Sequence, residues 1–379
     1  MKRKDVVMYS TGIMFDRINQ TGGVKRFVEL TETLNNKYSE TILCSRDEEN
    51  VVELHSIKNF IRLKSAKKKF CFLPLEFALL LSNLSAIKEL KKKAYRNVVI
   101  FDVPPAIGPI LCGVTNIVLM IRKDLVGYEK VQNRSKLKWL KICFLWLCES
   151  ICLSRANQII TQCVYDKDVL KMRHPLLATR IEKKTIIQIN NVNPSWIVSK
   201  SKESIDAIFN LCKEGFRVCF VGGFDNPRKG QDLFLAAASE ILKESKDIYF
   251  VLIGGGGKLE EYKNKYYNDN ISFLGRLENP IKILKQCDLL VVPSYADSCP
   301  NTVMEALYND VPVVGSRAGG IPEILNNEDS LFELDSYSLR TKILQLKNSE
   351  TSLQNLKDWQ KSRKNELTFD WAEKIIDKL

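Results

Sequence analysis

The sequence predicts an α/β protein made of two Rossmann-like domains, each built around a parallel sheet. Short runs rich in Val and Ile alternate with longer segments of helical periodicity, and this alternation is typical of βα units and of a parallel sheet. The alternation occurs in two successive series. The length of 379 residues also exceeds about 250 residues, the size at which a single hydrophobic core usually stops growing.

The first series forms the predicted N-terminal domain, residues 1–194. It opens on an apolar run that is too short for the core of a signal peptide, so we interpret this run as a strand. The first helix begins beside the paired glycines Gly22 and Gly23. The predicted strands of this series are DVVMYS from Asp5, VVIFDV from Val98, NIVLMI from Asn116 and QIITQC from Gln158.

The second series forms the predicted C-terminal domain, residues 195–358. An Asn-rich turn and a stretch rich in Lys and Ser, between Asn190 and Gly215, mark the join. The last residues, 359–379, are predicted to form a short amphipathic helix that packs back toward the N-terminal domain. The predicted strands of this series are RVCFVGG from Arg217, YFVLIGG from Tyr249, ISFLG from Ile271, DLLVVPS from Asp288 and VPVVGS from Val311.

Composition restricts the classes of partner. The chain is 45% hydrophobic and 27% charged, as ordinary folded proteins are. Its net charge of +12 favours anionic partners: nucleic acid, an acidic membrane surface or phosphorylated small molecules. The lysines are scattered over helices and turns, without the fingerprint of a nucleic-acid module, so no nucleic-acid partner is predicted.

Cysteines and histidines give no sign of a disulfide framework or a metal centre. His55 and His174 are the only histidines and belong to no ligand-spaced cluster, so no metal site is predicted. No apolar run reaches the 18 or so residues of a membrane-spanning helix, so none is predicted. The eleven cysteines are interpreted as reduced, buried thiols because they lie singly in apolar stretches, as do Cys71, Cys143, Cys148, Cys152 and Cys219.

Glycine-rich turns follow several predicted strands. Open α/β sheets bind ligands at the carboxyl ends of their strands, so two facing sheets would form an interdomain cleft lined by these turns. Gly22 and Gly23 would let a phosphate approach the N–H groups that open the first helix. Gly254 and Gly255 would allow close backbone contact in the same way. Each pair can equally be an ordinary tight turn.

A second turn of the C-terminal domain carries two cations. Arg228 and Lys229 lie in the segment VGGFDNPRKGQDL, between a predicted strand and a predicted helix. A cation in this place can neutralise a diphosphate. Its ordinary alternative is a solvated surface charge.

The segment from Tyr295 to Ile324 is more specific. Asp297 follows a buried strand and Glu305 lies in the first turns of the next helix, and carboxylates are strong acceptors for sugar hydroxyls. The start of that helix favours a diphosphate, because its N–H groups and dipole attract anions. A capping acid and a helix-surface acid remain the alternative. The N–H groups concerned lie around Asn301, Thr302 and Val303.

Taken in order along nearly the whole chain, these motifs resemble the GT-B fold glycosyltransferases of family 4, the "glycosyl transferases group 1" type. The resemblance implies a GT-B architecture, in which the N-terminal domain binds the acceptor and the C-terminal domain binds a nucleotide sugar. The motifs that carry it are IIQINNVNP, GGFDNPRKGQD, VLIGGGGKLEEY, PSYADSCPNTVMEAL and VPVVGSRAGGIPEI.

The resemblance also implies roles for single residues. Of the family's acid-x7-acid motif, Asp297 would hold the transferred sugar and Glu305 the ribose of the nucleotide. Lys229 would be the principal phosphate cation, and these three are the predicted catalytic residues. The predicted donor-binding residues are Gly23, Arg228, Gly254, Gly255, Asn301, Thr302 and Val303, and the predicted acceptor-side residues are Gly22 and Arg122.

Three regions depart from the family's usual pattern. Asp297 stands where Glu is usual and is shorter by one methylene. Gly223 stands where Arg is common. Arg122 and Asp124 occupy the region after a strand in which many relatives carry a His, and Arg122 could bind a phosphate or a sugar or form a structural salt bridge.

The function implied is a retaining transferase that moves a sugar from a UDP- or GDP-sugar to a hydroxyl of a glycan or lipid-linked acceptor. Cell-envelope polysaccharide synthesis, such as that of O-antigen, capsule or lipopolysaccharide, is the expected setting. No cofactor and no metal are expected, because no Asp-x-Asp motif occupies a matching position. The alternatives are a catalytically degenerate GT-B scaffold that binds a nucleotide or a partner, and a GT-B phosphorylase or epimerase.

Two amphipathic regions bear on localisation. They combine Lys clusters with Phe, Leu and Trp, which suits an anionic membrane surface, although helices packed on a sheet would show the same pattern. We therefore expect a cytoplasmic protein, with the inner face of the cell membrane as a candidate peripheral site. The regions are KSAKKKFCFLPLEFALLLSNLSAIKELKKK from Lys64 and RSKLKWLKICFLWLCESIC from Arg134.

Overall fold

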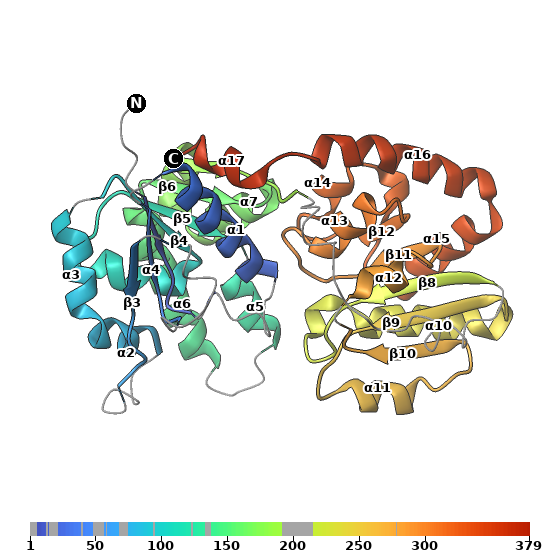
Figure 1. The fold of residues 1–379 in the computed structure, drawn as a ribbon. Helices are drawn as coiled ribbons and strands as arrows, with labels where there is room; N and C mark the ends of the chain where they lie inside the picture. Colours follow the sequence, from blue (N-terminus) through green and yellow to red (C-terminus); the bar gives the residue numbers. More distant parts are fainter. Residues whose placement is uncertain are drawn as a thin grey trace. The chain divides into compact units, whose positions relative to one another are not determined.

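The chain divides into two compact units, each with its own parallel sheet and helices (Figure 1). The first unit comprises Met1–Gln188 and Asp370–Leu379, and the second comprises Ile189–Phe369. The predicted boundary at residue 194 lies outside the described residues. The computed structural model describes the chain except for residues 1–5, 13, 15–21, 39–40, 48–56, 58, 68–74, 94, 123, 133–137, 192–214 and 278.

The first unit holds a parallel sheet of seven strands in the order β3-β2-β1-β4-β5-β6-β7. Its central strands are buried along most of their length, which explains their Val and Ile content, because a parallel strand is covered on both faces. The order reverses between β1 and β4, and such switch points are where open sheets bind ligands. The strands are β1 (Val6–Tyr9), β2 (Ile42–Ser45), β3 (Asn59–Arg62), β4 (Asn97–Phe101), β5 (Ile117–Ile121), β6 (Gln158–Thr161) and β7 (Thr185–Ile187).

Helices cover the sheet of the first unit. One hydrophobic cluster joins the inner faces of α3, α4, α6, α7 and α8 to the strands. The helices are α1 (Gly22–Lys37), α2 (Leu75–Ser82), α3 (Leu84–Lys93), α4 (Val103–Leu111), α5 (Leu125–Gln132), α6 (Lys138–Arg155), α7 (Val164–Arg173), the 3-10 helix η4 (Pro175–Leu177) and α8 (Ala178–Lys184).

The end of the chain is part of the first unit. In α17 (Trp371–Ile376), the Trp371 side chain is buried, and the Arg26 guanidinium lies 5.0 Å from the centre of its ring. Glu373 pairs with Lys37 of α1. The Asn97 side chain donates a hydrogen bond to the carbonyl of Leu379 at 2.9 Å. These contacts join the last ten residues to the first unit, whereas α16 (Glu350–Leu367) belongs wholly to the second.

The second unit holds a parallel sheet of six strands in the order β10-β9-β8-β11-β12-β13, so its switch point lies between β8 and β11. The two parallel sheets confirm the predicted fold class. The strands are β8 (Phe216–Val221), β9 (Ile248–Ile253), β10 (Ile271–Gly275), β11 (Leu289–Val292), β12 (Val313–Ser316) and β13 (Leu331–Phe332).

Two hydrophobic clusters lie on opposite faces of this sheet. One contains residues of α10 and α15, and the other contains residues of α12, α13 and α14. The remaining elements are η6 (Pro227–Lys229), α10 (Gln231–Glu244), α11 (Leu259–Lys265), α12 (Pro280–Leu284), α13 (Asn301–Tyr308), α14 (Ile321–Leu325), η7 (Glu328–Ser330) and α15 (Ser336–Asn348).

The described cysteines are free thiols. Cys148, Cys152 and Cys219 are buried, as predicted, and burial raises the pKa of the Cys152 thiol, which keeps it protonated. The prediction was wrong for Cys143, because that residue lies on an outward turn of α6 and is exposed. Cys71 lies outside the described residues. Among the helices that the structure describes, none combines the length and the apolar composition needed to cross a bilayer.

Candidate functional site

The candidate site of the second unit lies where the loops after β8 and β11 meet. After β8 the chain forms the turn η6, and Gly230 then opens α10 with a φ of 74°. A Cβ atom at Gly230 would lie 1.9 Å from the carbonyl oxygen of Pro293. The N–H of Tyr295 donates to the carbonyl of Arg228 at 2.8 Å. Only a glycine at position 230 permits this close approach of the two loops.

This approach brings two predicted catalytic residues into contact. The Lys229 ammonium lies 2.6 Å from the Oδ2 atom of Asp297. Their side chains are 23% and 13% exposed, so both remain within reach of a ligand. The pair lies at the switch point between β8 and β11, the position at which open α/β sheets bind ligands.

Asp297 is held from its backbone side by the paired glycines Gly319 and Gly320. The N–H of Gly320 donates to the carbonyl of Asp297 at 2.9 Å. Gly319 has a φ of 60°, and a Cβ atom there would lie 2.4 Å from that carbonyl oxygen. The glycine pair therefore fixes the loop that presents the Asp297 carboxylate.

The helix α13 begins beside this loop. Pro300 occupies the cap position without a side-chain capping bond, and Asn301 is the first helical residue. The Asn301 side-chain oxygen accepts a hydrogen bond from Asn190 at 3.4 Å. Val303 directs its N–H to the carbonyl of Pro300 at 3.1 Å. The N–H groups of Asn301 and Thr302 precede the first intrahelical bonds, as N-terminal groups of helices do.

Glu305 lies in the second turn of α13 and is half-buried. Its backbone carbonyl accepts hydrogen bonds from the N–H and the side chain of Asn309, at 3.2 and 2.7 Å. The structure thus joins Asp297 to Lys229 directly and places Glu305 on the adjoining helix.

The glycine-rich turn after β9 packs against the loop after β8. Gly254 donates its N–H to Gly275 at 2.8 Å, and a Cβ atom at Gly254 would lie 1.9 Å from the carbonyl oxygen of Gly222. The carbonyl of Gly255 accepts from Phe224 at 3.0 Å. Close packing therefore requires a glycine at position 254. Because the N–H of Gly254 is already bonded, any contact of this turn with a nucleotide sugar would use other atoms.

Asp225 stabilises the same turn, a role that the sequence did not predict. Its carboxylate accepts the N–H groups of Gly257 and Lys258, at 2.9 and 3.1 Å. Gly257 and Lys258 lie 32 and 33 residues further along the chain, so sequence spacing gives no sign of this contact.

The predicted acceptor-side residues lie in the first unit. Gly22 and Gly23 form the first turn of α1. Arg122 follows β5 and donates to the Oδ2 atom of Asp102 at 2.6 Å, while its backbone N–H donates to Oδ1 at 3.1 Å. The Arg122 guanidinium also lies 4.8 Å from the centre of the Phe101 ring. Of the alternatives for Arg122, the salt bridge is therefore present, with a partner that sequence reasoning missed.

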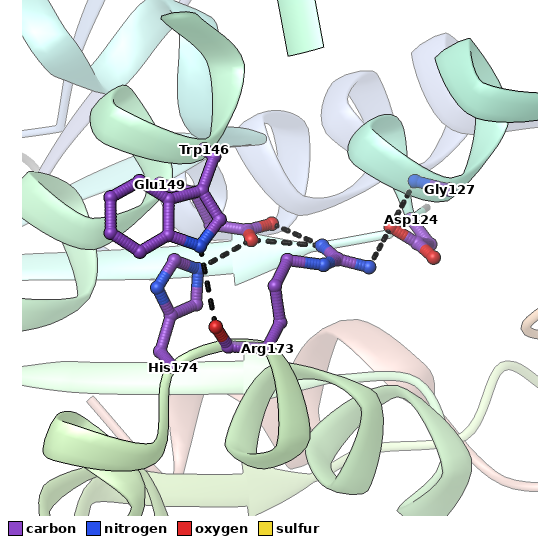
Figure 2. A network of polar contacts seen from close by, with 6 residues as sticks. All are labelled: Asp124, Gly127, Trp146, Glu149, Arg173 and His174. Atoms are coloured by element: carbon purple, nitrogen blue, oxygen red, sulfur yellow. Dashed lines mark hydrogen bonds and ion pairs between the residues drawn. The ribbon is translucent and has the colours of Figure 1, made fainter. Parts of the chain in front are cut away.

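A second polar network of the first unit involves Asp124 (Figure 2). Arg173, at the end of α7, donates to both carboxylate oxygens of Glu149, at 3.0 and 2.8 Å, and to the carboxylate of Asp124. Burial lowers the pKa of the Arg173 guanidinium, but Glu149 and Asp124 outweigh this effect and raise it. Asp124 also accepts the N–H of Gly127 at 2.9 Å. The network therefore fixes the start of α5 through Asp124, which lies two residues after Arg122.

His174 completes this network. Its Nε2 atom lies 2.7 Å from a Glu149 oxygen, and its ring stacks on Trp146 at a centroid distance of 5.2 Å (Figure 2). His174 is thus a packed, buried residue. In the part of the chain that the structure describes, no three His, Cys, Asp or Glu side chains form a cluster able to hold a metal ion.

Comparison with known proteins gives the family of a segment of the second unit. Residues 215–349 match the family model described as "Glycosyl transferases group 1". This segment belongs to the group 1 glycosyl transferases. The group 1 segment contains Lys229, Asp297 and Glu305, so the contact at the switch point lies within the matched region.

Two curated relatives match parts of the chain. The N-acetyl-alpha-D-glucosaminyl L-malate synthase of Bacillus anthracis is 30% identical over 114 residues, 29% of this chain and 29% of that protein. The GalNAc-alpha-(1->4)-GalNAc-alpha-(1->3)-diNAcBac-PP-undecaprenol alpha-1,4-N-acetyl-D-galactosaminyltransferase of Campylobacter jejuni is 31% identical over 120 residues, 30% of this chain and 33% of that protein. The chain spans about a third of the length of each of these relatives.

A solved structure matches nearly the whole chain. The sucrose-phosphate synthase of Thermosynechococcus elongatus superposes with a TM-score of 0.76 over 99% of this chain and 98% of that one, at 19% identity. At this identity the likeness shows the fold alone. It confirms the predicted GT-B architecture around the group 1 segment.

The glycine contact behind Asp297 gives a testable prediction. We expect Gly319→Ala to lower the free energy of unfolding of the group 1 segment by about 1–3 kcal/mol, because a positive φ and a 2.4 Å contact with the Asp297 carbonyl both oppose a Cβ atom. Urea unfolding followed by circular dichroism measures this change.

Gly257→Ala is the matched control. Its Cβ atom would meet Asp225 at an ordinary 3.6 Å, so the expected change is within about 0.5 kcal/mol. Equal stability of the two variants would contradict the packing that we describe behind Asp297.

Proposed function

We propose that the protein is a retaining glycosyltransferase that moves a sugar from a UDP- or GDP-sugar to a hydroxyl of a glycan or lipid-linked acceptor. The observation that carries this proposal is the contact between Lys229 and Asp297 at the switch point of the group 1 segment. A cation and a carboxylate side by side match the two parts of a nucleotide sugar, an anionic diphosphate and a sugar rich in hydroxyls.

The diphosphate would lie between Lys229 and the start of α13. The N–H groups of Asn301 and Thr302 and the helix dipole offer a positive end, and the Lys229 ammonium adds a full charge. Arg228 is adjacent in the chain and extends the positive region. In this arrangement the protein itself neutralises the phosphates, so we propose that turnover needs no metal ion, and that donor turnover persists in EDTA.

The ion pair also suggests how a donor would enter. In the structure, Lys229 and Asp297 neutralise each other at 2.6 Å. An arriving diphosphate is a stronger anionic partner for Lys229 than Asp297 is. A sugar hydroxyl then donates a hydrogen bond to Asp297 in place of Lys229. Both side chains keep a charge-assisted partner in either state. Glu305 would accept the ribose hydroxyls from α13.

The transfer step breaks the bond between the sugar C1 and the diphosphate oxygen and forms a bond from C1 to the acceptor oxygen. Positive charge grows on the sugar ring and negative charge on the leaving diphosphate. The proton of the acceptor hydroxyl passes to the departing diphosphate on the same face, which preserves the anomeric configuration. Lys229 and the start of α13 are preorganised for the charge that develops on the leaving group.

The acceptor proposal draws on a relative and on α6. The Campylobacter relative is named for an acceptor linked to undecaprenol through a diphosphate. In this chain, α6 exposes an apolar face beside Lys138 and Lys141, which suits an anionic bilayer surface. We therefore propose peripheral binding at the cytoplasmic face of the membrane and a role in envelope polysaccharide synthesis. The exposed apolar residues of α6 are Trp139, Leu140, Cys143, Trp146 and Leu147.

Lys229→Ala tests the donor site. We expect kcat/KM for the donor to fall about 10²–10³-fold, as for other lost charge-stabilising groups. The assay detects nucleoside diphosphate release from UDP- and GDP-sugars in EDTA.

Glu305→Ala should abolish binding of UDP and GDP in calorimetry.

Lys263→Ala is the matched control, because Lys263 is paired with Glu260 on the surface of α11. Its activity should equal that of the wild type. Unchanged donor turnover in Lys229→Ala, or unchanged nucleotide binding in Glu305→Ala, would overturn the site assignment.

Vesicle sedimentation tests the membrane proposal. The double variant Trp139→Ser with Leu147→Ser should lose most of its binding to vesicles that contain phosphatidylglycerol, because the apolar contact with the bilayer is removed. The wild type should bind at low salt and be released by about 0.5 M salt, which screens surface charge. Wild-type protein that stays in the supernatant at low salt would remove the membrane from the proposal.

A further inference from the structure

A cavity of the first unit lies at the switch point between β1 and β4. Its volume is about 240 Å³, slightly below the range of about 300–1,000 Å³ that drug-sized ligands occupy, so its size suits part of a ligand, such as one sugar ring. Ser10, Thr11 and Gly12 form one side, and Asp102 and Arg122 contribute the charges. The family resemblance assigns the acceptor to this unit and places Arg122 on the acceptor side, but it does not choose between a phosphate and a sugar as the ligand of Arg122.

Asp102 has a backbone conformation that is almost confined to glycine. Its φ is 66° and its ψ is 161°, and residues with side chains persist there only where the surroundings impose strain, often at ligand sites. Asp102 occupies the cap position of α4, yet its side chain makes no capping bond. The ordinary reason for an acid at a helix start is therefore missing here.

The Asp102 carboxylate is instead held inside the cavity wall. It accepts two hydrogen bonds from Arg122, at 3.1 Å from the backbone and 2.6 Å from the guanidinium. The residue is 7% exposed. A carboxylate has about four acceptor positions, so two bonds leave it able to accept from a ligand hydroxyl.

The charge of the lining selects the kind of ligand. Asp102 and Arg122 carry the only charges among the lining residues that the structure describes, and they cancel. A phosphate would have to displace Asp102 from Arg122 and approach a carboxylate, which costs free energy. A neutral sugar can accept from the guanidinium and donate to the carboxylate without breaking the pair.

The rest of the lining suits the apolar face of a sugar ring. It combines aliphatic, aromatic and Pro side chains around the polar pair, and mostly apolar walls with a few placed polar groups are typical of ligand sites. Asp47 supports one wall, because its carboxylate accepts the N–H of Met14 at 2.8 and 3.0 Å. The apolar lining residues are Met14, Val24, Phe27, Phe101, Pro104, Pro105 and Leu125.

We propose that the Asp102–Arg122 pair recognises the hydroxyls of an uncharged sugar residue of the acceptor, and that Asp102 determines this specificity. The inference rests on the proposed function, since it names the acceptor group of the same reaction. Of the two ligands considered for Arg122, the proposal selects a sugar and not a phosphate. Asp102 is a binding residue, and the leaving diphosphate still takes the proton of the acceptor hydroxyl.

Saturation-transfer NMR on the full chain, without any donor, tests this proposal. The probes are the methyl glycosides of glucose, galactose and their N-acetylamino derivatives, with the 6-phosphates of the same sugars for comparison. We expect at least one neutral glycoside to bind and its 6-phosphate to bind at least about 10-fold more weakly. Asp102→Asn should weaken binding of the neutral glycoside about 10-fold or more.

Two further variants separate recognition from folding. Asp102→Gly also removes the carboxylate but adopts the native backbone without strain, so it should melt no lower than Asp102→Asn and still lose the glycoside. Asp310→Asn is the matched control: Asp310 also has a positive φ, of 58°, and is paired with Lys364 at 2.9 Å. That variant should bind the glycosides as the wild type does.

Three results would overturn the inference: binding of no neutral glycoside, tighter binding of the 6-phosphates, or wild-type binding by a folded Asp102→Asn or Asp102→Gly. If the Asp102–Arg122 ion pair only stabilised the fold, Asp102→Asn would weaken binding of the neutral glycosides and of the 6-phosphates to the same degree. Failure of the proposed function would be seen separately, as a lack of UDP and GDP binding in calorimetry, because the glycoside experiment contains no donor.

Discussion

The contact between Lys229 and Asp297 is the interaction on which the candidate donor site depends. It joins the loops after two neighbouring strands, and it requires that the loops approach to a distance that only glycine at position 230 allows. Gly319 permits a second close approach behind Asp297. A charge pair at the switch point is thus a product of backbone packing, since the glycines around it set where the two side chains can meet.

The first unit has a comparable arrangement at the ends of its own strands. Asp102 follows β4 and Arg122 follows β5, and their side chains also approach to 2.6 Å. Arg173 pairs with both Glu149 and Asp124, and Asp124 lies two residues beyond Arg122, so this network fixes the chain next to the pair. Each unit therefore presents a neutral ion pair at a strand end, and a ligand with both donors and acceptors can replace or bridge the partners.

The sequence predicted the repeated βα pattern and the long central strands, because buried parallel strands are continuous runs of Val, Ile and Leu. It did not predict β2, β3, β7 or β13: β3 and β7 contain no fully buried residue, and β13 has only two residues, so their apolar pattern is weak. Cys143 was misplaced for a related reason: α6 is apolar around much of its circumference, so its outward face could not be read from periodicity.

Spacing and residue type were sufficient to predict Lys229 and Asp297 as candidate site residues. They were not sufficient for Asp102 and Asp225, whose importance depends on tertiary contacts with Arg122 and with a glycine-rich turn. The strained backbone of Asp102 is likewise invisible in the sequence, because Asp is common at helix starts for the ordinary purpose of capping.

Hydrogen–deuterium exchange of the full chain, with and without UDP and GDP, tests whether Lys229 and Asp297 form the donor site. We expect slower exchange in the peptides that cover residues 226–230 and 297–303, with α15 unchanged as an internal reference. Protection confined to the first unit, or protection of the second unit that leaves both peptides unchanged, would contradict a donor site built on Lys229 and Asp297.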